Sequence, residues 1–331
     1  MIISRTPFRI SFFGGGTDFP EWYNDYPGKV ISTTINKYWY ITSRILPPFF
    51  KYNYRLRYYK TEEVKKIQDI KHPTIREVLK YKKFNSKLEL SHTADLPALS
   101  GMGASSSFTV GLLNTLNALN GKMASKREIA SEACFIEQKK CKDFVGSQDQ
   151  YAASFGGFNV INFTNNNIEV NLLPDSHNNI KCLEKSIILI FTGFQRKANL
   201  IEKDKIGKIK KNSNYYKLIY ELTKEAEHQL FTSKNIIKDF SNLINDYWEI
   251  KKKLSKSLSN KNIDDMNNFL KKNGASSCKL LGAGNGGFVM CLVDKKNKKN
   301  LLMRINKLLV VPVSFEKLGS QLIYYSSNEK Y

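Results

Sequence analysis

A loop of small residues between two apolar segments is the strongest chemical signal in this sequence. It reads LPALSGMGASSS over residues 96–107, here called the glycine-serine loop, and runs into a stretch of helical spacing that reaches Leu119. Glycine lets backbone amides approach an anion closely, and the first turn of a helix favours negative charge. The loop is therefore typical of a phosphate-binding site with hydroxyls for Mg²⁺, although composition alone is equally typical of a capped helix start.

The familiar nucleotide-binding motifs do not account for this loop. The sequence has no GxxxxGK[ST] motif and neither of the kinase motifs HRDxxxxN and DFG, so another phosphate-binding loop is needed. A GxGxxG pattern occurs at residues 282–287, which raises a dinucleotide-dependent oxidoreductase as an alternative. That fingerprint must lead into a helix, whereas here it leads into an apolar, strand-like run. The glycines then either let the backbone pass close to a substrate or form only a tight hairpin.

Three charged residues are candidates for chemistry when they are taken together. Arg9 lies on the first apolar segment, ahead of a GGGTD turn at residues 14–18, and Asp149 follows a helical stretch that contains Glu137. Each residue alone is more typical of a surface ion pair. Combined with a phosphate-binding loop, an arginine, an aspartate and a glutamate are what phosphoryl transfer requires.

Composition restricts the other function classes. The formal charge of +22 among 331 residues favours polyanions and makes nucleic-acid binding an alternative, but the lysines of 202–211, 251–262 and 294–299 alternate with Asn and Ser and are predicted to be solvated faces. Five cysteines without a CxxC pair and four scattered histidines indicate no zinc site, so a bound metal needs oxygen ligands. No apolar run approaches the roughly 20 residues that span a bilayer, and the N-terminus lacks a signal peptide, so we expect a cytoplasmic protein.

The elements that must position these residues alternate between strands and helices. Strands are predicted at 2–13, 87–92, 158–163, 168–173 and 186–192, with paired strands at 29–45. Helices are predicted at 61–83, 105–119, 126–141 after a Ser125/Glu128 capping box, and over most of 196–273. A strand-turn-strand follows at 278–293, with a closing helix and strand. This order favours an α+β protein of two domains, 1–185 and 186–331.

In this order the segments resemble the GHMP kinase superfamily. The similarity falls at residues 5–20, 96–107, 137–151 and 279–293. Within the superfamily, RTPFRISFFGGGTDFP at 5–20 looks like the opening of D-glycero-D-manno-heptose 7-phosphate kinases. Galactokinases have Gly-Glu-His where this chain has three glycines at 14–16, whereas fucokinase-type enzymes share GGGTD and are the alternative. The resemblance implies a ribosomal-protein-like N-terminal domain and a ferredoxin-like C-terminal domain.

The resemblance also implies roles for residues around a cleft. Asp149 would accept or orient the proton of the attacking hydroxyl, and Arg9 would stabilise charge beside it. The ATP phosphates would be bound by Pro97, Ser100, Gly101, Met102, Gly103, Ala104, Ser105, Ser106 and Ser107. Mg²⁺ would be held by Glu137 and Ser105, or by Ser106 in place of Ser105, because Ala104 replaces the first of two serines usual at this point. The sugar phosphate would contact Gly15, Gly16, Thr17, Asp18, Gly284, Asn285, Gly286 and Arg196.

The reaction implied is ATP-dependent phosphorylation of the anomeric C1 hydroxyl of D-glycero-D-manno-heptose 7-phosphate. The 1,7-bisphosphate would serve nucleotide-activated heptose and the synthesis of capsule, lipopolysaccharide or S-layer glycans. The expected partners are the sugar phosphate and MgATP, without nucleic acid or membrane. The oligomeric state, monomer or homodimer, stays open. Asn285 replaces a family glycine, and Asn tolerates the left-handed backbone that such a turn needs.

Overall fold

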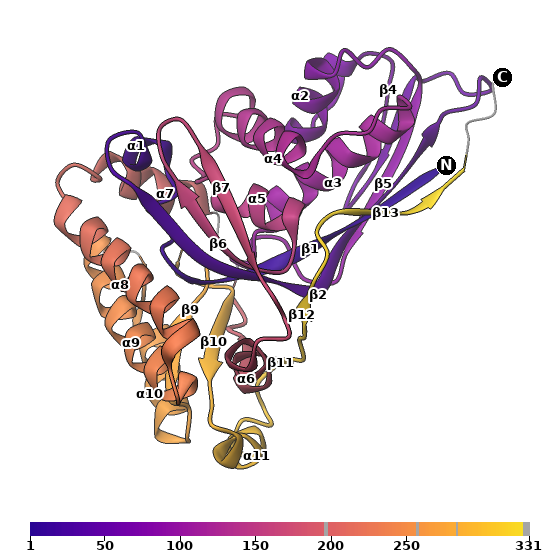
Figure 1. Cartoon of the computed structure of the whole chain (residues 1–331). Helices are drawn as coiled ribbons and strands as arrows, with labels where there is room; N and C mark the ends of the chain where they lie inside the picture. The colour runs from indigo at the N-terminus through magenta and orange to yellow at the C-terminus, as the bar shows by residue number, and fades with distance from the viewer. Residues whose placement is uncertain (195–197, 256–257, 283, 327–331) are drawn as a thin grey trace.

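Two sheets organise the chain in the computed structural model, which describes residues 1–194, 198–255, 258–282 and 284–326 (Figure 1). The larger sheet has nine strands and the smaller has four. The nine-stranded sheet runs in the order β13-β1-β2-β5-β3-β4, with β12 and β6 also paired to β2 and β7 paired to β6. Its strands are β1 (Ile2–Phe13), β2 (Gly28–Ile45), β3 (Tyr54–Arg57), β4 (Thr61–Val64), β5 (Leu88–Ala94), β6 (Phe158–Phe163), β7 (Ile168–Leu173), β12 (Phe315–Glu316) and β13 (Gln321–Tyr325).

The prediction of paired strands over 29–45 is wrong, because β2 is one continuous strand of 18 residues. Its first half pairs with β6 and its second half with β5, and both halves pair with β1. The pairing with β1 slips between Pro7 and Phe8, where Asn36 and Lys37 of β2 form a bulge. The bulge lies opposite a proline, which has no N–H to donate.

Helices of the N-terminal half cover one face of the nine-stranded sheet. They are α2 (Pro73–Tyr81), α3 (Ala104–Leu119), α4 (Lys126–Phe135) with a π-helical extension (Ile136–Lys140), and α5 (Gln148–Phe155). The predicted capping box is confirmed, since Ser125 and Glu128 exchange both bonds at the start of α4. The helix predicted over 61–83 is wrong in its first part. Residues 61–64 form β4, a short 3₁₀ turn follows (Ile67–Asp69), and α2 starts at Pro73, a residue suited to the first helical turn.

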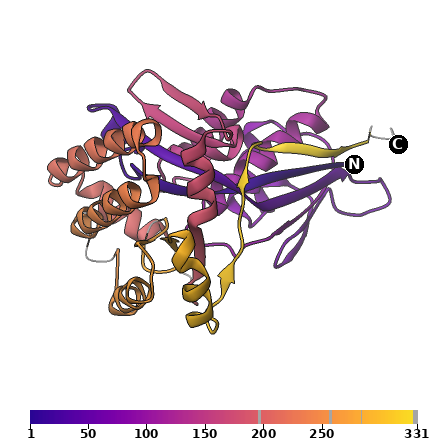
Figure 2. The same ribbon diagram turned by 60° about the horizontal axis from the view of Figure 1, so that its bottom comes forward.

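The smaller sheet is antiparallel, in the order β11-β8-β10-β9, and belongs to the second half of the chain. Its strands are β8 (Ile187–Phe191), β9 (Ser277–Leu280), β10 (Phe288–Leu292) and β11 (Val310–Val311). The helices of this half are α7 (Ala198–Gly207), α8 (Ser213–Thr232), α9 (Ile236–Leu254), α10 (Lys261–Lys272) and α11 (Lys295–Arg304), preceded by α6 (Asn178–Ser186). Figure 2 shows the long helices gathered on the side of the molecule opposite the two chain ends.

The end of the chain returns to the first sheet. Strand β13 pairs antiparallel with β1, and β12 pairs with β2 (Figure 1), so Ser326 lies beside Met1 and the two exchange hydrogen bonds. By sheet membership, residues 315–325 therefore lie with the N-terminal half. The division at residue 185 stays a prediction, to which the structure adds this C-terminal return.

A single hydrophobic core connects the two halves. Phe13, at the end of β1, packs edge-on against Phe240 and Tyr247 of α9, with ring centroids 5.3 and 5.6 Å apart. Phe12 contacts Phe158 on its own sheet and Phe240 across the junction. Strand β1 is thus held on both sides, and Arg9 and Ser11 on it are fixed where the halves meet. Among the residues described, no helix has the length and apolarity to cross a bilayer.

Candidate active site

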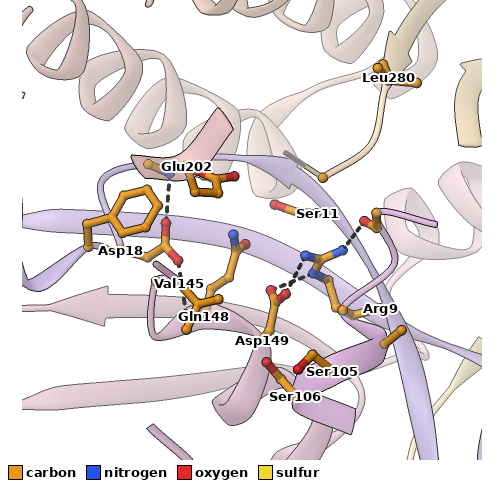
Figure 3. Close-up of a pocket in the computed structure, with 18 of the residues that line it drawn as sticks. Arg9, Ser11, Asp18, Ser105, Ser106, Val145, Gln148, Asp149, Glu202 and Leu280 are labelled. Carbon is orange, nitrogen blue, oxygen red and sulfur yellow. Dashed lines mark hydrogen bonds and ion pairs between the residues drawn. The ribbon is translucent and has the colours of Figure 1, made fainter. Parts of the chain in front are cut away.

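A pocket lies at the junction, where the ends of β1, α3 and α5 from the first half meet α7, α9 and β9 from the second (Figure 3). Its wall contains five of the predicted loop serines and glycines, the predicted catalytic pair and part of the GGGTD turn. The lining residues that matter below are Arg9, Ser11, Gly15, Gly16, Asp18, Ser100, Gly101, Gly103, Ala104, Ser105, Ser106, Gln148, Asp149, Glu202, Lys205, Tyr247, Lys251, Lys279 and Gly282.

The glycine-serine loop adopts a backbone suited to anions. Leu99, Gly101 and Gly103 all have positive φ, at 60°, 78° and 74°, and α3 begins directly after Gly103. The first-turn amides of this 16-residue helix have no partners inside the helix. They point out of its N-terminus, which carries a partial positive charge. This loop could bind phosphate oxygens through backbone alone, which is why its side chains need only be small.

The second glycine-rich segment braces this loop. A Cβ on Gly101 would lie 2.4 Å from the carbonyl oxygen of Leu281, and one on Gly287 would lie 2.3 Å from that of Ser100. Both approaches are closer than any side chain permits. The match to GxGxxG therefore marks a strand-to-strand hairpin that packs against the glycine-serine loop, as its position before β10 indicates.

Asp149 lies in the first turn of α5 and is paired with Arg9 through two parallel hydrogen bonds. Arg9 Nε donates to Oδ1 at 2.7 Å and Nη2 donates to Oδ2 at 2.6 Å, while Nη1 donates to the Gly101 carbonyl at 2.6 Å. The Arg9 side chain is 5% exposed and that of Asp149 is 21% exposed. The arginine thereby ties the carboxylate to the glycine-serine loop, and the carboxylate stays open to the pocket.

Glu137 is almost fully buried beneath the start of α3. Its carboxylate accepts hydrogen bonds from Ser105 at 3.1 Å, Ser106 at 2.8 Å and Thr109 at 2.8 Å, and also from the Gln150 amide. Burial raises the pKa of Glu137 above its ordinary range, and the four donors oppose that rise. The residue lies on the π-helical turn after α4, an irregularity often found at functional sites.

This arrangement fits Mg²⁺. A carboxylate and hydroxyls are the hard oxygen ligands that Mg²⁺ prefers, and the remaining positions are usually filled by water and substrate phosphates. Both candidate serines line the pocket and both donate to Glu137, so Ser105 and Ser106 stand equal as ligands. No cluster of three or more His, Cys, Asp or Glu side chains suited to a metal occurs in the described part of the chain. Were Mg²⁺ bound here, its ligands would be Glu137, a serine hydroxyl and oxygens of the nucleotide; Glu137 itself is buried and does not line the pocket.

The GGGTD turn holds a second buried carboxylate at the other side of the pocket. Asp18 accepts from the Gly16 amide at 2.7 Å and from the Gln148 amide, at the start of α5, at 3.3 Å. Burial, followed by the nearby Asp149 charge, raises the pKa of Asp18, and the two amides oppose the rise. A Cβ on Gly146 would lie 1.9 Å from the Asp18 carboxylate, so a glycine is needed there. Asp18 thus fixes the turn against the helix that carries Asp149.

Some predicted residues lie elsewhere. Met102 is buried in the core, Ser107 donates to the Pro7 carbonyl at 2.8 Å, and Thr17 donates to the Gly14 and Lys29 carbonyls. Their side chains are not available to a ligand. Pro97 is exposed but does not line the pocket.

The C-terminal candidates Gly284, Asn285 and Gly286 do not line the pocket either. Gly284 packs on Leu258, Asn285 accepts from Asn260 at 2.5 Å, and Gly286 packs on Phe194. Asn285 has the left-handed φ of 62° expected of it. From this segment the pocket takes Leu280 and Gly282 instead. Arg196 lies outside the described residues.

Three lysines of the pocket were missed. Lys205, Lys251 and Lys279 are 3%, 9% and 4% exposed, so the prediction that the lysines of 202–211 and 251–262 are all solvated is wrong for the first two. For Lys251 a signal existed. It follows Ile244 and Tyr247 by seven and four residues, on the apolar stripe of α9.

Comparison with known proteins decides the family. The family model described as "GHMP kinases N terminal domain" matches residues 70–157. The D-glycero-alpha-D-manno-heptose 7-phosphate kinase of Campylobacter jejuni is 32% identical over 321 residues, which cover 92% of this chain and 93% of that protein. The chain belongs to the GHMP kinase family. This GHMP kinase is thus a phosphotransferase with an alcohol group as acceptor, and the family uses ATP as the donor.

Two further similarities bear on fold and on the alternative substrate. The crystal structure of a D-glycero-D-manno-heptose 1-phosphate kinase from Bacteroides thetaiotaomicron superposes with a TM-score of 0.80 at 23% identity, over 99% of this chain and 100% of that one. A bifunctional fucokinase/GDP-fucose pyrophosphorylase of Arabidopsis thaliana is 26% identical over 231 residues, 66% of this chain and 21% of that protein. The first similarity confirms the predicted two-domain α+β fold.

Proposed function

We propose that this GHMP kinase transfers the γ-phosphoryl group of MgATP to the anomeric C1 hydroxyl of D-glycero-D-manno-heptose 7-phosphate. The observation that carries the proposal is the double hydrogen bond between Arg9 and Asp149, directly beside the glycine-serine loop. It joins a carboxylate open to the pocket with the loop that would bind the phosphates.

The chemistry follows from this placement. Asp149 accepts the proton of the C1 hydroxyl as its oxygen bonds to the γ-phosphorus, the bond from that phosphorus to the bridging oxygen breaks, and ADP leaves with the electron pair. Because an anomeric hydroxyl is more acidic than an ordinary alcohol, a carboxylate suffices as base. Arg9 holds that carboxylate in place and offsets the negative charge that gathers near the transferring group.

Donor binding is assigned to the first half of the chain. When bound, MgATP supplies the phosphoryl group and the metal charge that neutralises the phosphate oxygens. The amides of 100–106 would bind the phosphates, while Glu137 with Ser105 or Ser106 would hold the metal. The buried Ser100 hydroxyl has no partner in the described structure and lines the same wall, as expected of a group that waits for a ligand.

The choice of acceptor sugar is based on the curated relative, and the fate of the product is part of the proposal. The relative named as a heptose 7-phosphate kinase covers nearly the whole chain, and we extend its acceptor to this protein, with the 1,7-bisphosphate destined for nucleotide-activated heptose and a surface glycan such as capsule. We place the reaction in the cytoplasm, where ATP is available. Free fucose is the alternative acceptor, favoured by the shorter similarity to a fucokinase.

A kinase panel tests this assignment. The purified protein, with MgATP, is offered heptose 7-phosphate, mannose 6-phosphate, fucose, galactose and mevalonate, and ADP release is followed. We expect kcat/KM for heptose 7-phosphate to exceed that for every other acceptor by at least about 100-fold, a difference of about 2.7 kcal/mol. Turnover of fucose without turnover of heptose 7-phosphate would assign the enzyme to the fucokinase type.

A further inference from the structure

Two buried lysines, Lys205 and Lys251, line the pocket. Lys205, on α7, forms an ion pair with Glu202 at 2.6 Å. Lys251, on α9, donates to the Gly15 carbonyl at 2.9 Å and to the Tyr247 hydroxyl at 3.2 Å. Within the described residues no carboxylate comes within 4.0 Å of the Lys251 ammonium, so its hydrogen-bond partners are neutral.

A buried ammonium with only neutral partners is unfavourable. Desolvation lowers the pKa of both Lys205 and Lys251, and the nearby charges of Glu202 and Asp18 oppose that shift. The neighbouring Tyr216 hydroxyl is buried and has no partner in the described structure, which leaves another donor unsatisfied. A dianionic group bound in the pocket beside the two lysines would balance their charge.

The third buried lysine is used differently. Lys279 donates to the Ser11 and Phe12 carbonyls at 3.0 and 2.6 Å and lies over the Tyr247 ring. It ties β9 to β1 in the middle of the pocket. These contacts connect the two sheets. We therefore assign Lys279 a structural role and do not group it with Lys205 and Lys251.

The Lys251 ammonium lies against the GGGTD turn, to which it donates a hydrogen bond. In Figure 3, Arg9, Asp149, Ser105 and Ser106 lie at one end of the pocket, and Asp18 and Glu202 lie at the other. Gly15 is next to the second end, since a Cβ there would lie 3.1 Å from the Lys251 ammonium. An acceptor whose hydroxyl meets Asp149 therefore extends along the GGGTD turn toward Lys251.

We propose that Lys251 and Lys205 form a subsite for the phosphomonoester of the acceptor and make the enzyme select phosphorylated over free sugars. The inference rests on the proposed function and adds the residues that read the second phosphate. Lys251 contributes an ammonium that forms no ion pair with a carboxylate in the described part of the chain, and Lys205 contributes a second charge by sharing its ammonium between Glu202 and the ligand. Asp18 is left to contact sugar hydroxyls between the two ends.

The test compares one sugar with and without its phosphate. For Lys251→Met we expect kcat/KM for heptose 7-phosphate to fall about 10–100-fold, the range for one charge-assisted hydrogen bond, and kcat/KM for unphosphorylated heptose to change less than about threefold. Lys251→Arg keeps the charge and should restore part of the loss. Lys252→Met, the next residue on α9, partly exposed and paired with Glu249, is the matched control and should resemble the wild type.

Equal losses with both sugars, or no loss with either, would overturn the subsite. Thermal melting shows whether Lys251→Met folds. If it does not fold, the two sugars are compared with Lys205→Met instead. Inorganic phosphate is also titrated by calorimetry into protein saturated with a non-hydrolysable MgATP analogue, which occupies the first phosphate site. Phosphate binding that Lys251→Met abolishes supports the subsite even if no heptose is turned over, a result that would refute only the proposed function.

Discussion

Replacing Asp149 by asparagine tests the transfer centre with little change in shape. Asparagine keeps one oxygen that accepts from Arg9 Nε–H. In place of Oδ2, which accepts from Arg9 Nη2 at 2.6 Å, it presents an amide N–H₂ that cannot accept. Loss of a positioned base costs about 10²–10⁴ in rate. The corresponding rise in the activation barrier is about 2.7–5.4 kcal/mol.

Folding and nucleotide binding should be affected much less. Arg9 keeps its bond to the Gly101 carbonyl, and the Asp149 carboxylate is partly exposed, so we expect a loss of about 1–3 kcal/mol in the free energy of unfolding rather than collapse. The amides of the glycine-serine loop are unchanged. The dissociation constant for MgATP should therefore stay within about threefold of the wild type, because asparagine alters no donor that faces the phosphates.

The assay couples ADP release to NADH oxidation, and calorimetry measures nucleotide affinity on the same preparation. Asp265→Asn, an exposed aspartate on α10, makes the same carboxylate-to-amide change away from the pocket and should leave kcat unchanged. A kcat for Asp149→Asn within tenfold of the wild type, with the protein folded, would remove Asp149 from the role of base.

Three further predictions concern the metal, the loop and acid stability. Glu137→Gln should raise the Mg²⁺ concentration for half-maximal rate at least about tenfold, since it removes the buried charge; an unchanged Mg²⁺ titration would contradict the site. Gly101→Ala should lower the melting temperature and MgATP affinity more than Gly121→Ala, because both have positive φ but only the first meets backbone; equal losses would mean that the hairpin does not brace the loop. Burial lowers the pKa of His92 to about 4, so its neutral form stabilises the fold fully above about pH 6.5 and this contribution is lost as pH falls toward 4. His92→Phe should reduce acid destabilisation in that window by about 1–2 kcal/mol, discounted for partial exposure, as measured by urea unfolding at pH 7 and 4.5.

Local sequence signals were sufficient for much of the transfer centre. The glycine-serine loop and the start of α3 depend on residues next to each other in the chain, so their pattern indicates them directly. Arg9 and Asp149 are 140 residues apart in the sequence, yet the family resemblance predicts that both belong to one catalytic site. That pairing is now seen, while the catalytic roles stay predictions.

The second end of the pocket could not be predicted in the same way. Three successive lysines end α9, and only Lys251 is buried, because helix rotation turns it toward Gly15 while Lys252 and Lys253 face outward. Lys205 is buried because α7 packs against the rest of the protein, and the sequence around Lys205 carries no signal of that packing. The return of β13 to β1 is likewise a long-range pairing of a five-residue strand, and such pairings leave little trace in a local pattern.

Phosphorus NMR of the reaction product tests the central claim most directly. The protein is incubated with MgATP and D-glycero-D-manno-heptose 7-phosphate, and the phosphorus spectrum is recorded with coupling to the sugar protons. We predict one new phosphomonoester signal coupled to the anomeric proton, equal in amount to the ADP formed, with the 7-phosphate signal retained. A new phosphate coupled to any other sugar proton, or ADP formed without a sugar bisphosphate, would contradict transfer to C1 at the Arg9–Asp149 centre.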